Sequence, residues 1–171
     1  MSGWRYPLSE IAGAVGGRVT GDASFVVEGV SVDSRGNSAP NNLFIALRGP
    51  RHDGHDHLRE LAARGVRAFM VDEARAAEYA DLDMIAVPDP LAALQRFAAW
   101  HRAHFSIPVI GITGSNGKTV VKEWLWRMLR GEEHIVRSPG SWNSRTGVPL
   151  SVLETGPAHT LGIFEAGIST T

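Results

Sequence analysis

The residues best suited to chemistry lie in one short stretch, Gly111-Ile-Thr-Gly-Ser-Asn-Gly-Lys118-Thr119. An apolar run, residues 107–112, leads into it, and an amphipathic segment begins at Lys118, so we expect a strand, a glycine loop and a helix. Glycines let successive backbone N–H groups converge on an anion, and a helix start adds the positive end of its dipole. Lys118 would supply a charge for the β- and γ-phosphates, and the Thr119 hydroxyl a ligand for magnesium. The stretch therefore predicts a site for nucleotide phosphates.

The glycine spacing departs from two common nucleotide motifs. The usual phosphate loop has a glycine five residues before Gly117, where this chain has Ile112. A dinucleotide fingerprint has its first two glycines two positions apart, whereas Gly111 and Gly114 are three apart. We therefore predict a variant phosphate loop. The alternative is a glycine-rich turn that only joins a strand to a helix.

Around this loop, strands and helices alternate, which predicts an α/β architecture: a small α/β domain, then the first part of a doubly wound parallel sheet. Strands are expected at residues 18–20, 25–32, 43–47, 66–71, 84–87, 107–112, 134–136 and 161–165. Helices are expected at residues 7–15, 56–64, 73–79, 90–104, 118–130 and, in part, 147–153. The predicted domains are residues 1–106 and 107–171. Only about three strands follow residue 106, fewer than the usual five or six, so we expect a fragment of a longer enzyme.

Local signals refine the helices. Asp89 before Pro90 predicts a helix cap, and Ser9 is a candidate cap for the first helix. After the loop, helical spacing predicts an apolar face that includes Trp124, with Glu123 and Arg127 pairing on the other side.

Composition excludes several classes of protein. The chain has 17 basic and 18 acidic residues, so no basic field is present to hold nucleic acid. It has no cysteine, which excludes disulfides, thiol nucleophiles and cysteine-ligated zinc. No apolar run reaches the length of a membrane span, and the first residues lack the plan of a signal peptide. We therefore expect a cytosolic protein that does not insert into a membrane; the oligomeric state is left open.

Other polar residues allow two interpretations each. Glu165 ends a strand and could be a magnesium ligand or a solvated carboxylate. Asp33-Ser34-Arg35 could contact a substrate or form a plain turn with a local side-chain bond. His55 is expected to fix its loop or touch the substrate, because a metal site among the nearby histidines lacks diagnostic spacing. Asn143 could contact a substrate or stabilise its own turn.

Three segments resemble the bacterial Mur ligases, in the order that this family has them. Residues 111–122 resemble their ATP loop. The segments Val32-Asp-Ser-Arg35, Leu43-Phe-Ile-Ala-Leu-Arg-Gly49 and Asp53-Gly-His55 resemble their N-terminal UDP-binding domain. Residues 138–153, especially Trp142-Asn-Ser-Arg-Thr-Gly-Val-Pro-Leu150, resemble the MurF branch, which joins D-alanyl-D-alanine to UDP-N-acetylmuramoyl-tripeptide. Lys118-Thr-Val-Val-Lys-Glu-Trp124 is most similar to branch members fused to an alanine racemase.

The resemblance implies a role for each matching residue. The ATP phosphates would be held by Gly114, Ser115, Asn116, Gly117, Lys118 and Thr119. Thr119 and Glu165 would bind Mg²⁺, with Lys118 and Glu165 as the catalytic pair. Ser34 and Arg35 would lie near the uridine diphosphate, and Asn143 and Ser144 would face the muramoyl end. His55 is a further substrate-binding candidate. Two departures from the family pattern are Val120, where a second Thr or Ser is frequent, and Ser144, where Asn is frequent.

The implied reaction is amide formation through an acyl phosphate, with ATP and Mg²⁺ as cofactors. Its developing charge needs placed cations and N–H dipoles more than a covalent nucleophile. Alternatives are another Mur ligase such as the MurE type, a different phosphate-loop protein, or a non-catalytic module that binds UDP-sugars. A GTPase is disfavoured because no Asn-Lys-x-Asp tetrapeptide occurs. We expect the fragment alone to be inactive, because the family's carbamylated lysine and its amino-substrate domain would lie after Thr171.

Overall fold

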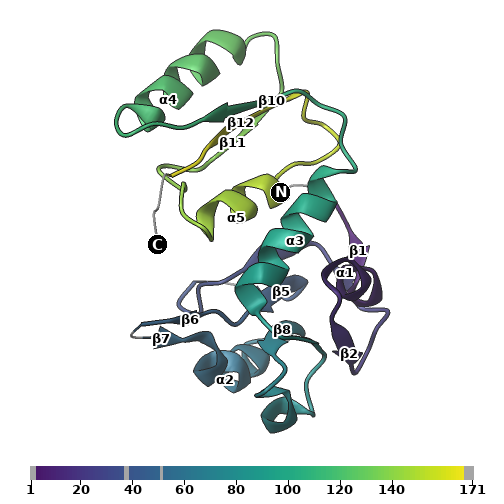
Figure 1. Ribbon diagram of the computed structural model, residues 1–171. Helices are drawn as coiled ribbons and strands as arrows, with labels where there is room; N and C mark the ends of the chain where they lie inside the picture. Colours follow the sequence, from purple (N-terminus) through teal and green to yellow (C-terminus); the bar gives the residue numbers. More distant parts are fainter. Residues whose placement is uncertain (1–2, 37–38, 51, 168–171) are drawn as a thin grey trace. The chain divides into compact units, whose positions relative to one another are not determined.

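The computed structural model describes residues 3–36, 39–50 and 52–167 and divides the chain into two compact units (Figure 1). The first unit spans residues 3–97, and the second begins at Ala98. The division falls inside helix α3 (Pro90–Arg102), ahead of the boundary predicted near residue 106. The last turns of α3 belong with the elements that follow, because buried His101 bonds through Nε2 to the carbonyl oxygen of Thr155 at 2.9 Å.

The first unit is built on a five-stranded sheet of order β2-β9-β8-β5-β4. The four neighbours β9, β8, β5 and β4 run parallel, and β2 pairs antiparallel at one edge. The strands of this sheet are β2 (Arg18–Thr20), β4 (Gly29–Ser31), β5 (Asn42–Ile45), β8 (Ala68–Asp72) and β9 (Met84–Val87). Its helices are α1 (Leu8–Val15), η1 (Gly54–His57), α2 (Leu58–Ala63), η2 (Ala76–Tyr79) and most of α3. Phe44, Phe69 and Leu58 form part of a buried core.

Several predicted elements of this unit differ in detail. The strand expected at residues 25–32 is split into β3 (Val26–Val27), which pairs with β1 (Tyr6–Pro7), and β4. The expected loop before His55 contains a small hairpin of β6 (Arg48–Gly49) and β7 (His52–Asp53). The helix expected at residues 73–79 is only the short 3₁₀ turn η2.

The two predicted caps have different outcomes. Asp89 caps α3, because its Oδ1 accepts from the N–H groups of Leu91 and Ala92 at 2.8 and 3.1 Å. The cap predicted at Ser9 is wrong: Ser9 lies inside α1, which starts at Leu8.

The second unit has a parallel three-stranded sheet of order β10-β12-β11. The strands are β10 (Val109–Ile112), β11 (Ile135–Arg137) and β12 (Leu161–Glu165), and the helices that follow α3 are α4 (Lys118–Leu129) and α5 (Gly147–Leu153). Figure 1 shows α4 and α5 on opposite faces of this sheet, as expected for a doubly wound fold. Ile112 is the register partner of Glu165, so the glycine loop and the carboxylate leave the sheet side by side.

Helix α4 buries a narrower face than predicted. Leu125 and Leu129 pack against the core of Ile112, Leu161 and Ile163. Trp124 was predicted to lie in the core, but it is 65% exposed. It sits about 100° around the helix from Leu125, and three strands offer only one narrow surface to the helix.

The expected pair of Glu123 with Arg127 is replaced by an ion pair between Glu123 and Arg137 of β11. The Arg137 guanidinium also lies 4.3 Å from the ring centre of Trp126.

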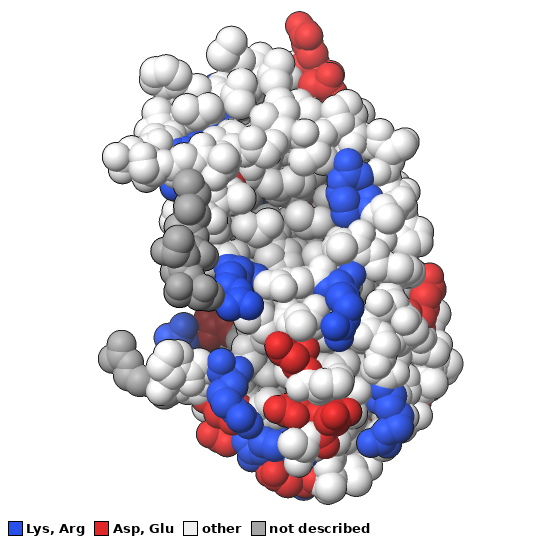
Figure 2. Space-filling model, in the orientation of Figure 1, with Lys and Arg blue, Asp and Glu red and all other residues white. Residues whose placement is uncertain are grey.

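The face of the molecule in Figure 2 shows basic and acidic side chains interspersed, in keeping with the net charge of −1. None of the helices in the described ranges is both long and apolar enough to cross a bilayer.

Candidate functional site

The glycine loop owes its shape to two residues. Gly114 has φ +138° and Gly117 has φ +76°, conformations that residues with a Cβ rarely adopt. Gly111 lies in strand β10 without a positive φ, as does Ile112, the residue at the position where the usual motif has glycine. The unusual spacing is therefore explained: the strand extends to residue 112, and the turn that needs glycine starts at Gly114.

The start of α4 points free backbone donors at this loop. The first bond of the helix runs from the N–H of Val121 to the carbonyl oxygen of Gly117, at 3.0 Å. The N–H groups of Lys118, Thr119 and Val120 precede that bond, and no side chain caps this helix end. The Lys118 side chain turns back over the loop, where its Nζ donates to the carbonyl oxygen of Gly114 at 2.7 Å. The start of the helix and the ammonium thus lie together at the loop, an arrangement suited to a phosphate group.

The predicted metal ligands lie together. Thr119 Oγ1 donates to Glu165 Oε2 across 2.9 Å, and the Glu165 side chain is fully buried. Two neighbouring ligands of an octahedral magnesium ion, each at 2.0–2.1 Å, are themselves separated by about 2.9 Å. A hydroxyl and a carboxylate are also hard oxygen donors. The pair therefore fits Mg²⁺, which Thr119 and Glu165 would hold.

Lys122 is a member of the site that the sequence reasoning missed. Its side chain is fully buried, and its Nζ donates to the carbonyl oxygens of Ser138, at 2.8 Å, and of Gly140, and to Glu165 Oε1 at 3.2 Å. A signal was available, because position 122 shares the sheet-facing stripe of α4 with Leu125 and Leu129. A lysine in such a stripe requires a buried partner.

Asn143 and Ser144 lie in the loop between β11 and α5. The N–H of Gly167 donates to the carbonyl oxygen of Asn143 at 2.7 Å, so this loop is tied to the chain two residues after Glu165. Ser144 Oγ accepts from the N–H of Gly147 at 3.0 Å, which holds the start of α5. The structure thus brings the loop to the phosphate end of the sheet. The predicted contact of both residues with a substrate stays a prediction.

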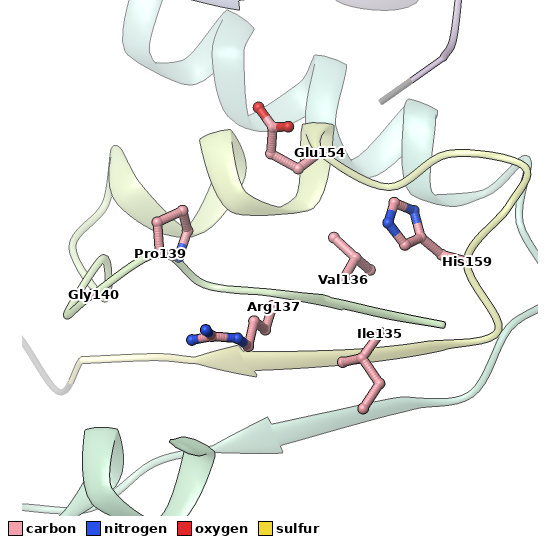
Figure 3. Close-up of a pocket in the computed structure, with 7 residues that line it drawn as sticks. All are labelled: Ile135, Val136, Arg137, Pro139, Gly140, Glu154 and His159. Carbon is pink, nitrogen blue, oxygen red and sulfur yellow. The ribbon is translucent and has the colours of Figure 1, made fainter. Parts of the chain in front are cut away.

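A pocket of about 540 Å³ lies on the α5 side of β11 (Figure 3). Strand β11 lines one side, and Glu154 and His159 lie across from it. Its lining contains none of the residues predicted for phosphate, metal or substrate, although it includes Gly140, a partner of Lys122.

In the first unit, Asp33-Ser34-Arg35 is a turn with the local bond that was one of its two interpretations. Asp33 Oδ1 accepts from the backbone N–H of Arg35 at 3.0 Å, and hydrogen bonds from Arg35 hold the pKa of Asp33 below its usual value. Arg64 donates to the carbonyl oxygens of Ser34 and Gly36 at 2.9 and 2.8 Å and so holds the turn from beneath. The Arg35 guanidinium donates to both carboxylate oxygens of Asp33, at 3.0 and 3.2 Å, but the side chain is 85% exposed, so a further anion can still reach it.

His55 is buried and bonded at both ring nitrogens. Its Nδ1 lies 2.6 Å from Asp53 Oδ1, and its Nε2 accepts from the N–H of Asp72 at 3.0 Å, which places the ring hydrogen on Nδ1. Burial opposes ionisation of Asp53, but the bonds from His55 and Arg48 outweigh it and lower the pKa of Asp53 to about 2. This geometry supports the role of fixing the loop, and a contact between His55 and a substrate stays a prediction. Within the described residues, no group of three or more acidic, histidine or cysteine side chains could hold a metal.

Comparison with known proteins shows two family models in tandem. Residues 26–102 match the model described as "Mur ligase family, catalytic domain", and residues 112–171 match the "Mur ligase middle domain". Together they cover most of the chain, and the second takes in the whole of the glycine loop from Thr113 to Thr119.

Similar curated proteins are named UDP-N-acetylmuramoyl-tripeptide--D-alanyl-D-alanine ligase. The one from Treponema pallidum is 38% identical over 95% of this chain, which corresponds to 38% of that relative. The one from Escherichia coli is 32% identical over 94% of this chain and 34% of its own length. The chain therefore spans little more than a third of these relatives.

Similar solved structures carry the same kind of name. A crystal structure of MurF from Acinetobacter baumannii matches with a TM-score of 0.90 and 25% identity, over 100% of this chain and 37% of that one. The MurF ligase from Thermotoga maritima in complex with ADP matches with a TM-score of 0.69 and 28% identity, over 84% of this chain and 33% of that one.

Proposed function

Since the chain belongs to the Mur ligase family, we propose that it is the nucleotide-binding part of a longer, ATP-dependent ligase of the MurF type. The whole protein would join D-alanyl-D-alanine to UDP-N-acetylmuramoyl-tripeptide, a step of peptidoglycan precursor synthesis. The relatives and solved neighbours support this choice of branch over the MurE type. The proposal keeps residues 1–106 as the UDP-substrate domain and residues 107–171 as the start of the ATP domain.

One observation carries the proposal: the glycine loop, the start of α4, Lys118 and the pair of Thr119 with Glu165 converge at the same end of one parallel sheet. Ligand sites of open α/β sheets lie at the carboxyl ends of their strands, which is where these groups are. A glycine turn that only connects two elements would need neither the ammonium nor the buried carboxylate.

Each group has a task in acyl-phosphate formation. The loop amides from Gly114 to Thr119 and the Lys118 ammonium hold and neutralise the phosphates, so that the γ-phosphorus is presented to the substrate carboxylate. Thr119 and Glu165 would hold Mg²⁺, which screens charge on the phosphate oxygens when bound. No residue of this chain has to act as a covalent nucleophile.

The proposal also includes contacts with the substrate. The exposed guanidinium of Arg35, on the turn held by Arg64, suits a pyrophosphate. Ser34 is mostly buried and would contribute through its backbone turn. Asn143 and Ser144 would face the muramoyl end. The remaining parts of the proposal are the amino-substrate site outside this chain, a cytosolic location and a fused alanine racemase.

Calorimetric titration of the chain tests the nucleotide assignment. We expect Mg²⁺·ATP to bind and GTP to bind at least tenfold more weakly. Lys118→Ala should weaken ATP binding at least tenfold, because a charged contact to the phosphates is worth about 1.5–3 kcal/mol. Arg127→Ala, an exposed cation on the same helix, should bind like the unchanged chain.

Equal binding of ATP and GTP, or unchanged binding by Lys118→Ala, would contradict the proposal. Binding of a uridine diphosphate sugar without any binding of ATP would instead favour the non-catalytic module.

A further inference from the structure

We propose that Lys122 is a positioning residue that fixes Glu165 for the metal, an inference that rests on the proposed nucleotide site. Lys122 Nζ bonds to Oε1 of Glu165 at 3.2 Å, whereas Thr119 bonds to Oε2 at 2.9 Å. The two oxygens of one carboxylate are thus divided between a fixed cation and the metal-binding hydroxyl. The division leaves Oε2 as the oxygen available beside Thr119.

The surroundings of Lys122 are those of a cation site. The ammonium is fully buried, and its partners are the carbonyl oxygens of Ser138 and Gly140 and the carboxylate of Glu165, with Glu123 Oε1 at 3.5 Å. Burying a charge is unfavourable unless hydrogen-bond partners satisfy it, and an ammonium offers three donors in total. Three partners within hydrogen-bond distance use all three. The side chain therefore has one well-defined position.

The same contacts connect the loop between β11 and α5 to the proposed metal site. Lys122 holds the carbonyl groups at both ends of residues 138–140, and Ser138 Oγ accepts from the backbone N–H of Glu165 at 3.2 Å. Asn143 follows three residues later and is held by Gly167. A single ammonium thus joins α4, the loop after β11 and the end of β12. Without this ammonium, both the Glu165 carboxylate and the loop after β11 would lose a fixed position.

Positioning and charge neutralisation predict opposite results. If Lys122 merely neutralised Glu165, removing it would leave a more negative carboxylate and tighter Mg²⁺ binding. If Lys122 positions the carboxylate, removing it lets the carboxylate rotate away from Thr119 and weakens Mg²⁺ binding. The fixed geometry of the contacts favours the second.

The test is the Mg²⁺ concentration at which nucleotide binding to the 171-residue chain is half complete, measured with fluorescent ADP. Lys122→Met removes the positive charge and keeps a flexible side chain of similar length. We expect this variant to raise the Mg²⁺ midpoint at least tenfold. It should change ADP affinity in EDTA less than twofold, because the glycine loop and Lys118 are untouched. Arg127→Met on the same helix is the matched control and should change neither value.

Chemical rescue provides a second measurement that does not depend on the methionine variant folding. Lys122→Ala is purified in ethylammonium chloride. Its Mg²⁺ midpoint should fall toward the midpoint of the unchanged chain as the amine concentration rises. Tetramethylammonium has no N–H donor and should not restore it.

The outcomes separate the inference from the function on which it rests. A Mg²⁺ midpoint that is unchanged or lower in Lys122→Met, while the unchanged chain binds ADP with magnesium, overturns the inference alone. Equal effects of both amines on Lys122→Ala also overturn it. Failure of the unchanged chain to bind ADP at any Mg²⁺ concentration overturns the proposed function and the inference with it.

Discussion

Replacing the loop glycines one at a time tests whether the phosphate loop starts at Gly114 rather than at Gly111. Gly111→Ala changes a residue without positive φ, and a Cβ there would meet no other atom within 4 Å. Gly114→Ala places a Cβ on a residue at φ +138°, where the nearest atom, the carbonyl oxygen of Asn116, is 4.0 Å away. The cost at Gly114 is therefore torsional strain rather than crowding.

The size of the effect follows from that difference. A residue forced into a glycine-only conformation costs about 1–3 kcal/mol, and each 1.4 kcal/mol is a factor of about ten in binding. If the loop relaxes to relieve the strain, its amides lose their common direction, and ATP affinity should fall about 5- to 150-fold. Gly111→Ala should leave affinity within twofold and stability within about 0.5 kcal/mol.

The assay combines calorimetric titration with Mg²⁺·ATP and urea unfolding followed by tryptophan fluorescence. Gly117→Ala is a third variant, and its φ of +76° predicts a cost of about 1–2 kcal/mol. The reasoning is refuted if Gly111→Ala weakens binding as much as Gly114→Ala, or if Gly114→Ala changes neither binding nor stability.

Three further predictions concern stability and association. Burial lowers the pKa of His101 from 6.5 to about 4, so the unfolded chain takes up a proton there before the folded chain does, and stability should fall as the pH drops from 6.5 to 4. The loss by pH 5 should be on the order of 1–2 kcal/mol, measured as the difference in urea unfolding between the unchanged chain and His101→Gln. Gly54→Ala should destabilise by about 1–3 kcal/mol in urea unfolding, because its Cβ would meet backbone atoms of Ala46 and Leu47 at 3.0 Å. Trp124→Glu should change the unfolding free energy by less than about 0.5 kcal/mol and reduce self-association in sedimentation experiments, because this ring is 65% exposed.

Each of these predictions has a result that counts against it. A loss of stability between pH 6.5 and 5 that is equal in His101→Gln would assign the effect to another group. Gly13→Ala is the control for Gly54→Ala, since its Cβ meets nothing within 4 Å inside α1; equal effects of the two would contradict the packing argument. A large loss of stability in Trp124→Glu would mean that the ring is buried after all.

The phosphate loop could be predicted from the sequence because its chemistry is local. Strand, glycines, lysine and helix are consecutive, so Lys118 and Thr119 followed from order alone. Glu165 could also be predicted, because it ends β12, a strand of the same parallel sheet as β10. Lys122 was missed because its partners, Ser138 and Glu165, are 16 and 43 residues away, and only the fold brings them together.

Trp124 shows a different limit of sequence reasoning. Helical spacing identifies an apolar face but not how much of that face the neighbouring sheet can cover. For Asp33-Ser34-Arg35 and His55, the residue types suit both binding and structure. The contacts show that His55 fixes its loop and that the Arg35 side chain is exposed, and which of these residues touches a substrate stays a prediction.

The register of β12 beside β10 has a consequence for which length changes the chain can tolerate. Thr119 and Glu165 meet because Ile112 pairs with Glu165. The strand register thus fixes the relative position of two segments that are distant in the sequence. One residue inserted or deleted within residues 161–165 would turn the carboxylate to the opposite face, since side chains alternate along a strand. The same change in residues 156–159, before the strand begins, would be accommodated by the loop and leave the pairing of Ile112 with Glu165 unchanged.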